Sequence, residues 1–91
     1  MKVNIYDSDK PNKRYVAIFS DGKIVYFSSP NYSNYTIHHD NQRKERYLKR
    51  HQKLERWYDF QTPGALARWI TWNKKTIEES IKDYKQRFNL D

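Results

Sequence analysis

The chain has 91 residues, a formal net charge of +7 and no cysteine, so we expect one domain without disulfides or a cysteine-ligated zinc. A chain this short needs a core dense in large side chains, and three Trp, eight Tyr and four Phe supply them. No apolar run approaches the ~20 residues of a membrane span, and the lack of cysteines and of an apolar leader in residues 1–10 favours a reducing, intracellular compartment.

The N-terminal third of the chain predicts an antiparallel sheet. Two runs rich in β-branched and aromatic residues flank the Asp-Gly pair at residues 21–22, which suits a two-residue type I′ turn. That turn would set Phe19 opposite Ile24 and leave both faces of the hairpin apolar, one under helices and the other partly covered. Residues 2–6 could add a third strand, which makes residues 1–28 a hairpin or a three-stranded meander.

A basic helix is expected in the middle of the chain. Residues 29–40 have the polar composition of a loop, and Asp40 is the expected N-cap of a helix over residues 41–59. The side chains that would face inward recur at i, i+4, i+7 and i+11, namely Tyr47, His51, Leu54 and Tyr58.

Positive charge is concentrated in this helix. Between Arg43 and Arg56 there are seven bases and two acids, so seven less two leaves +5 of the net +7. Such a concentration is typical of a surface for a polyanion, most often nucleic acid, and the alternative is a solvated helix face. Trp57 would close the core at the helix end or stack on a base. The candidate nucleic-acid-binding residues are Arg43, Lys44, Arg46, Lys49, Arg50, Lys53, Arg56, Trp57 and Arg68.

A tryptophan-rich helix is expected over residues 62–73. Thr62 is a suitable N-cap, and Pro63 suits the first helical position because its missing N–H would have no partner there. Trp69 and Trp72 lie one turn apart and are expected in the core, since small domains depend on buried aromatic rings.

The last helix is expected over residues 76–89. It begins with a capping box from Thr76 to Glu79. Its apolar stripe consists of Ile77, Ile81, Tyr84 and Phe88. Strands followed by three helices predict an α+β fold, in which one domain over residues 1–91 packs its helices on a small antiparallel sheet.

Enzyme chemistry is not expected. His38, His39 and His51 lack the spacing of metal ligands and are interpreted as ordinary polar residues rather than a metal site or a general base. The chain has no nucleophile elbow, and with Gly22 and Gly64 as its only glycines it has no glycine-rich phosphate loop. We therefore expect no catalytic residue, no metal and no cofactor.

Two stretches of the chain, residues 32–51 and 64–88, together carry one series of motifs. It consists of Tyr-Ser-x-Tyr-Thr, a His, an Asp and an Arg-Lys-x-Arg-Tyr helix ending in Arg-His, then Arg-Trp-x-x-Trp-x-Lys and a Ser-Ile-x-Asp helix ending in Arg-Phe. The residues are Tyr32, Ser33, Tyr35, Thr36, His38, Asp40, Arg43, Lys44, Arg46, Tyr47, Arg50 and His51, then Arg68, Trp69, Trp72, Lys74, Ser80, Ile81, Asp83, Arg87 and Phe88. The pattern resembles a group of small, uncharacterised basic proteins of nucleocytoplasmic large DNA viruses. The resemblance implies a viral origin and a compact domain in the virion or its replication compartment, and it implies no activity.

The sequence thus predicts a non-enzymatic module that binds nucleic acid through the basic helix, largely independently of base sequence. The alternative is a virion structural or scaffold component that docks on an acidic protein surface. The expected partner is therefore nucleic acid or an acidic viral protein, with no membrane, and the expected location is the virion or the host cytoplasm or nucleus.

Overall fold

A three-stranded antiparallel sheet begins the chain and helices follow it in the computed structural model, which describes all 91 residues. The strands are β1 (Val3–Asp7), β2 (Tyr15–Phe19) and β3 (Ile24–Phe27). The helices are α1 (Tyr35–His38), α2 (Asn41–His51), α3 (Pro63–Leu66), the π-helical turn η1 (Ala67–Thr71) and α4 (Ile77–Arg87). The predicted α+β fold is therefore confirmed.

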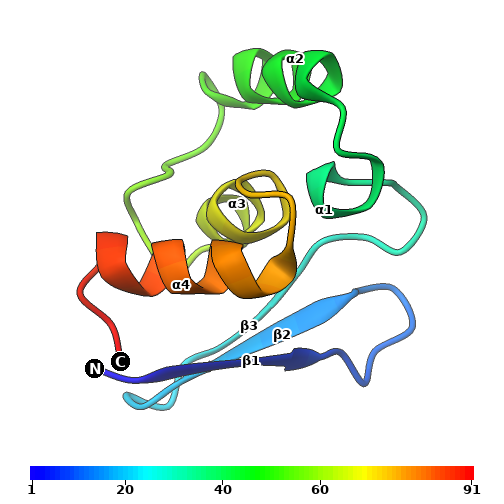
Figure 1. Cartoon of the computed structure of the whole chain (residues 1–91). Coiled ribbons are helices and arrows are strands. Elements are labelled where there is room, and N and C mark those ends of the chain that lie inside the picture. Colours follow the sequence, from blue (N-terminus) through cyan, green and yellow to red (C-terminus); the bar gives the residue numbers. More distant parts are fainter.

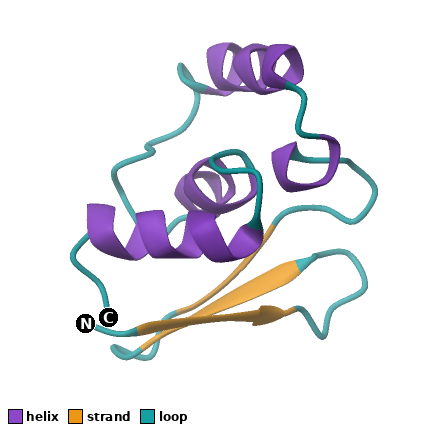
Figure 2. Ribbon diagram, in the orientation of Figure 1, coloured by secondary structure: helices purple, strands orange, loops and turns teal.

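The helices all lie on one side of the sheet (Figure 1). α3 and α4 lie next to the strands, whereas α2 is the element farthest from them, and the two chain ends meet at one end of the sheet (Figure 2). The ends are tied by backbone hydrogen bonds from Asp91 N to the Met1 carbonyl at 2.9 Å and from Val3 N to the Asp91 carbonyl at 3.1 Å. None of the helices has the length and apolar character needed to cross a membrane.

The β2–β3 hairpin has a three-residue loop instead of the predicted two-residue turn. Ile18 pairs with Ile24, so the predicted register was wrong by one residue. The Gly22 N–H donates to the Phe19 carbonyl at 3.0 Å, and the Phe19 N–H donates to the Lys23 carbonyl at 2.9 Å. With Gly22 at a φ of 95°, this is a type I turn followed by a left-handed residue, the usual three-residue hairpin.

This register places the large apolar side chains of the sheet on one face. The buried members are Val3, Ala17, Phe19, Val25 and Phe27. On the other face Val16 is buried, but Tyr6, Ile18 and Ile24 are exposed, because no helix lies on that side (Figure 2).

The helices that cover the sheet contribute the rest of the core. Leu66, Ile70 and Tyr84 are fully buried among the strand residues. The Tyr84 hydroxyl donates a hydrogen bond to the Phe60 carbonyl at 2.5 Å, which satisfies the one polar atom of this side chain. α4 begins as predicted, because the Thr76 hydroxyl accepts a hydrogen bond from the Glu79 N–H at 3.2 Å.

α2 ends at His51, eight residues before the predicted end of the basic helix at residue 59. The chain then turns back toward the core, where the Trp57 carbonyl accepts a hydrogen bond from Trp69 Nε1 at 2.7 Å. Leu54 and Tyr58 were predicted to face inward, and this was wrong, since they are 80% and 74% exposed. Packing of half-buried Trp57 against the core thus prevails over two more helical turns, since apolar burial stabilises more than helix propensity does.

Two other helices differ from prediction. The segment 29–40 contains the short helix α1, which was not predicted, although Asp40 caps α2 as expected by accepting from the backbone N–H of Gln42 and Arg43. The tryptophan-rich helix starts at Thr62 as predicted but widens into η1, where Trp72 N donates to the Ala67 carbonyl at 2.9 Å. Such a turn inserts an extra residue and is frequent at functional sites.

Candidate nucleic-acid interface

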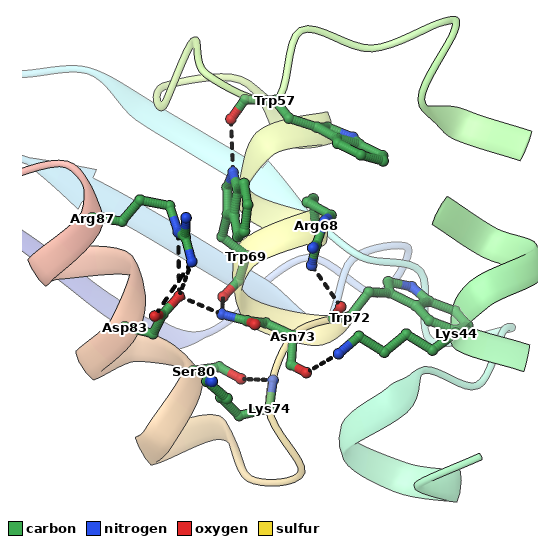
Figure 3. A network of polar contacts seen from close by, with 10 residues as sticks. All are labelled: Lys44, Trp57, Arg68, Trp69, Trp72, Asn73, Lys74, Ser80, Asp83 and Arg87. Carbon is green, nitrogen blue, oxygen red and sulfur yellow. Dashed lines mark hydrogen bonds and ion pairs between the residues drawn. The ribbon is translucent and has the colours of Figure 1, made fainter. Parts of the chain in front are cut away.

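α2 carries the positive charge, yet none of its residues is buried. A stack of three rings supports it: the Tyr47 ring lies 4.1 Å from Trp72 with a 4° interplanar angle, and 4.1 Å from His51 with a 24° angle. On the same helix, Lys44 Nζ donates a hydrogen bond to the Asn73 carbonyl at 2.6 Å (Figure 3). These contacts hold the helix at a distance from the sheet rather than packing it into the core.

Asn73 connects the supports of α2 to the rest of the fold. Its side-chain amide donates to the Trp69 carbonyl at 3.1 Å and to Asp83 Oδ2 at 2.6 Å, and Asp83 pairs with Arg87 at 3.2 Å (Figure 3). Burial by itself would raise the pKa of Asp83, but the hydrogen bond from Asn73 and the Arg87 guanidinium outweigh it and lower the pKa. The Asn73 side chain therefore links η1 and α4, and the Asn73 backbone carbonyl accepts the hydrogen bond from Lys44 of α2.

A cavity of about 520 Å³ lies between α2, the segment 28–33 and the end of η1. Three arginines of α2 at i, i+3 and i+7 line it, and none of its lining residues is acidic. We call it the arginine cavity, and its lining residues are Ser28, Ser29, Tyr32, Ser33, Arg43, Arg46, Tyr47, Arg50, His51, Ala67, Thr71 and Trp72. Guanidinium groups and hydroxyls can bind a phosphate, and aromatic rings can stack on a base attached to that phosphate through its sugar.

The charge of these arginines is not neutralised within the protein. The structure has two ion pairs, His51 with Glu55 at 3.4 Å and Arg87 with Asp83, so no carboxylate pairs with the arginines of the cavity. Burial, with a smaller contribution from Glu55, raises the pKa of Tyr47, which keeps its hydroxyl protonated. The cavity therefore presents hydrogen-bond donors and positive charge, a combination suited to an anion.

The wall opposite α2 is held by Arg14. Its guanidinium donates to three backbone carbonyls of one short segment, those of Ser29 at 3.1 Å, Pro30 at 3.3 Å and Tyr32 at 3.1 Å. Because one planar group holds three carbonyls, this wall is a defined surface rather than a loose loop.

The predicted binding residues divide into three groups in space. Arg43, Arg46 and Arg50 come together in the arginine cavity. Lys49 is exposed on α2 but does not line the cavity, and Lys53 and Arg56 are exposed beyond the end of the helix. The remaining three, Lys44, Trp57 and Arg68, are used inside the fold.

Lys44 contributes to tertiary packing instead of the outer surface. Besides the Asn73 carbonyl, its ammonium group lies 4.7 Å from the centre of the Tyr35 ring. Burial lowers the pKa of Lys44, and the positive charges of Arg68 and Lys74 add to this effect. Lys44 makes these internal contacts because helix periodicity places it on the side of α2 that faces the body of the protein.

Arg68 and Trp57 form an internal cluster with Trp69. The Arg68 guanidinium lies 4.2 Å from the Trp69 ring centre and 5.3 Å from that of Trp57, and it donates to the Trp72 carbonyl at 3.0 Å (Figure 3). Burial lowers the pKa of Arg68. Arg68 is therefore engaged in tertiary contacts, and half-buried Trp57 packs against the core, the first of its two predicted roles.

Nine of the twelve residues that line the cavity were not among the predicted binding residues, and four of the nine come from the segment between β3 and α1, namely Ser28, Ser29, Tyr32 and Ser33. The available signal was the density of Ser and Tyr between β3 and α1, but the same composition is typical of any loop. No cluster of three or more His, Asp or Glu side chains is present that could hold a metal ion. His38 instead accepts a hydrogen bond from the Asp40 N–H through Nδ1 at 2.9 Å.

Comparison with known proteins identifies a family. Residues 3–51 match the family described as "Family of unknown function (DUF5754)", which is more than half of the chain. The chain belongs to this family. The matched part comprises the sheet, α1 and α2, so it includes the arginines and the serine-rich wall of the cavity but not η1. No curated protein and no solved structure matches the chain, and the resemblance to viral basic proteins stays a prediction.

Proposed function

We propose that this protein is a non-enzymatic nucleic-acid-binding protein that holds the phosphate backbone with Arg43, Arg46 and Arg50. The observation that carries the proposal is the position of these three side chains, which line one cavity that has no acidic residue. Guanidinium groups suit phosphate because they donate two parallel hydrogen bonds as well as charge.

The energetics of α2 support a charged partner. Arg46 is three residues from Arg43 and four from Arg50, and like charges at these spacings cost a helix roughly 0.2–0.5 kcal/mol each. Neither acid of the region offsets this cost, since Glu45 makes no ion pair and Glu55 pairs with His51. A polyanion would relieve the repulsion, whereas an ordinary solvated helix face would usually contain compensating ion pairs.

Binding of this kind is largely independent of base sequence. Contacts to phosphates position a protein on nucleic acid, whereas base edges in a groove carry the sequence information. With three phosphates neutralised, log Kd should change with log salt with a slope of about 2 to 3 in magnitude.

The test compares two triple variants that remove equal charge. Arg43→Gln, Arg46→Gln and Arg50→Gln alter the cavity, whereas Lys23→Gln, Lys75→Gln and Lys82→Gln remove three exposed cations elsewhere. Fluorescence anisotropy with a labelled oligonucleotide at low salt should show about a hundredfold weaker binding for the first variant and a small change for the second.

Equal losses in the two variants would show that bulk charge alone attracts the ligand and would overturn the proposal. Docking on an acidic protein surface remains the alternative. It would be supported if the cavity variant bound nucleic acid like the wild type and the native protein kept a protein partner after nuclease treatment.

A further inference from the structure

Tyr32 is an exposed aromatic side chain at the rim of the arginine cavity. It is 74% exposed, although it lines the cavity together with the three arginines. Its backbone is nevertheless fixed, because its carbonyl accepts from Arg14 at 3.1 Å and its N–H donates to the Ser29 carbonyl at 3.3 Å. A large apolar ring is thus held in water without an aromatic partner of its own, since no ring of the protein stacks on it.

The cavity has the size and chemistry for one nucleotide. Its volume of about 520 Å³ lies within the range of about 300–1,000 Å³ that is usual for small-molecule sites. Cations lie along α2, and Ser28, Ser29 and Ser33 line the opposite wall with Tyr32. A nucleotide offers matching groups: a phosphate, a sugar that forms hydrogen bonds, and a flat base.

A duplex cannot use this combination. In double-stranded nucleic acid the bases are paired and stacked inside the helix, so a ring beside the phosphate site would meet no free base unless one is flipped out at a cost in free energy. In a single strand the bases are free to stack on aromatic side chains while the phosphates contact the cations.

We propose that the arginine cavity holds one unpaired nucleotide of a single strand, with its phosphate on Arg43, Arg46 and Arg50 and its base stacked on Tyr32. This inference rests on the proposed nucleic-acid-binding function and adds the form of the ligand. The protein therefore binds single-stranded nucleic acid more tightly than a duplex of the same sequence.

The chain offers a matched control for Tyr32. Tyr58 is also 74% exposed but lies outside the arginine cavity. Anisotropy with a labelled single strand should show roughly fivefold to hundredfold weaker binding for Tyr32→Ala, the range for loss of one stacked base. Tyr58→Ala and Tyr32→Phe should bind like the wild type, and binding to the duplex should not depend on Tyr32.

An oligonucleotide with abasic sites separates stacking from phosphate contact. The wild type should bind the abasic oligonucleotide as weakly as Tyr32→Ala binds the intact strand. Tyr32→Ala should bind the abasic oligonucleotide with the same affinity as the wild type does. Equal affinity of the wild type for single strand and duplex would overturn the inference, as would equal effects of Tyr32→Ala and Tyr58→Ala. In those outcomes a large loss in the Arg→Gln triple variant still supports the proposed function, whereas no loss in that variant removes both.

Discussion

α2 and α4 have the same length and opposite roles. Each has 11 residues, but α4 buries Ser80 and Tyr84, whereas α2 buries none. On α4 Asp83 pairs with Arg87, whereas the arginines of α2 have no acidic partner. Helices in proteins owe most of their stability to tertiary packing. The comparison therefore indicates that α4 stabilises the fold, whereas α2 is held out on a few contacts with its charge available.

The largest effect is expected from the core side of α4. Tyr84→Ala removes a fully buried ring and should lower the free energy of unfolding by about 3–5 kcal/mol, as measured by urea denaturation. Tyr84→Phe removes only the hydroxyl bonded to the Phe60 carbonyl and should cost about 1–3 kcal/mol, because that carbonyl loses its donor. If both variants were as stable as the wild type, α4 would not be the structural helix.

A smaller loss of stability is expected when the support of α2 is removed. Tyr47→Ala abolishes the stack with Trp72 and His51 and should cost about 1–3 kcal/mol. When both variants are measured under conditions in which they are fully folded, Tyr47→Ala should weaken nucleic-acid binding much more than Tyr84→Phe does, because the arginines lose their fixed position. Tyr47→Phe keeps the ring and should retain binding. Unchanged binding in Tyr47→Ala would mean that the stack does not position the helix.

The smallest effect is the pH dependence of the unfolding free energy that arises from His38, just before α2. Burial, followed by the charge of Arg43, lowers the pKa of His38 below its ordinary 6.5. Between these two pKa values the unfolded chain binds a proton that the folded protein does not. The contribution of His38 to the free energy of unfolding is therefore fully present above about pH 6.5 and declines as the pH falls toward the pKa of His38 in the folded protein.

Urea denaturation from above pH 7 to about pH 5 tests this sign. His38→Gln should show a flatter dependence of the unfolding free energy on pH than the wild type. Asp83, whose pKa is also lowered, contributes only below this window, because its ordinary value is 3.8. Parallel curves for wild type and His38→Gln would contradict the assignment.

Predictions that depend on neighbouring residues were correct. Asp40, Thr62 and Thr76 cap their helices as expected, because a cap involves atoms only two or three residues away. The apolar stripe of α4 also packs on the core, since its spacing matches one helix face and no competing contact redirects it.

Predictions that depend on distant contacts were incomplete. The Asp-Gly pair fits more than one hairpin loop, and the register that places Phe19 and Phe27 on the same face as Val3 was decided by the sheet. Likewise, the chain leaves the helical path after α2 to bring the Trp57 carbonyl within 2.7 Å of Trp69 Nε1, twelve residues away.

The sequence by itself determined the α+β order, the starts of α2, α3 and α4 and the location of the positive charge, because these follow from local spacing and composition. Only the tertiary structure decided which cations are free. Lys44 and Arg68 turn inward to the Asn73 carbonyl and to two tryptophan rings, whereas Arg43 and its neighbours face a cavity. The physical reason is that a cation's partner depends on which distant segments fold beside it, and no local pattern encodes that.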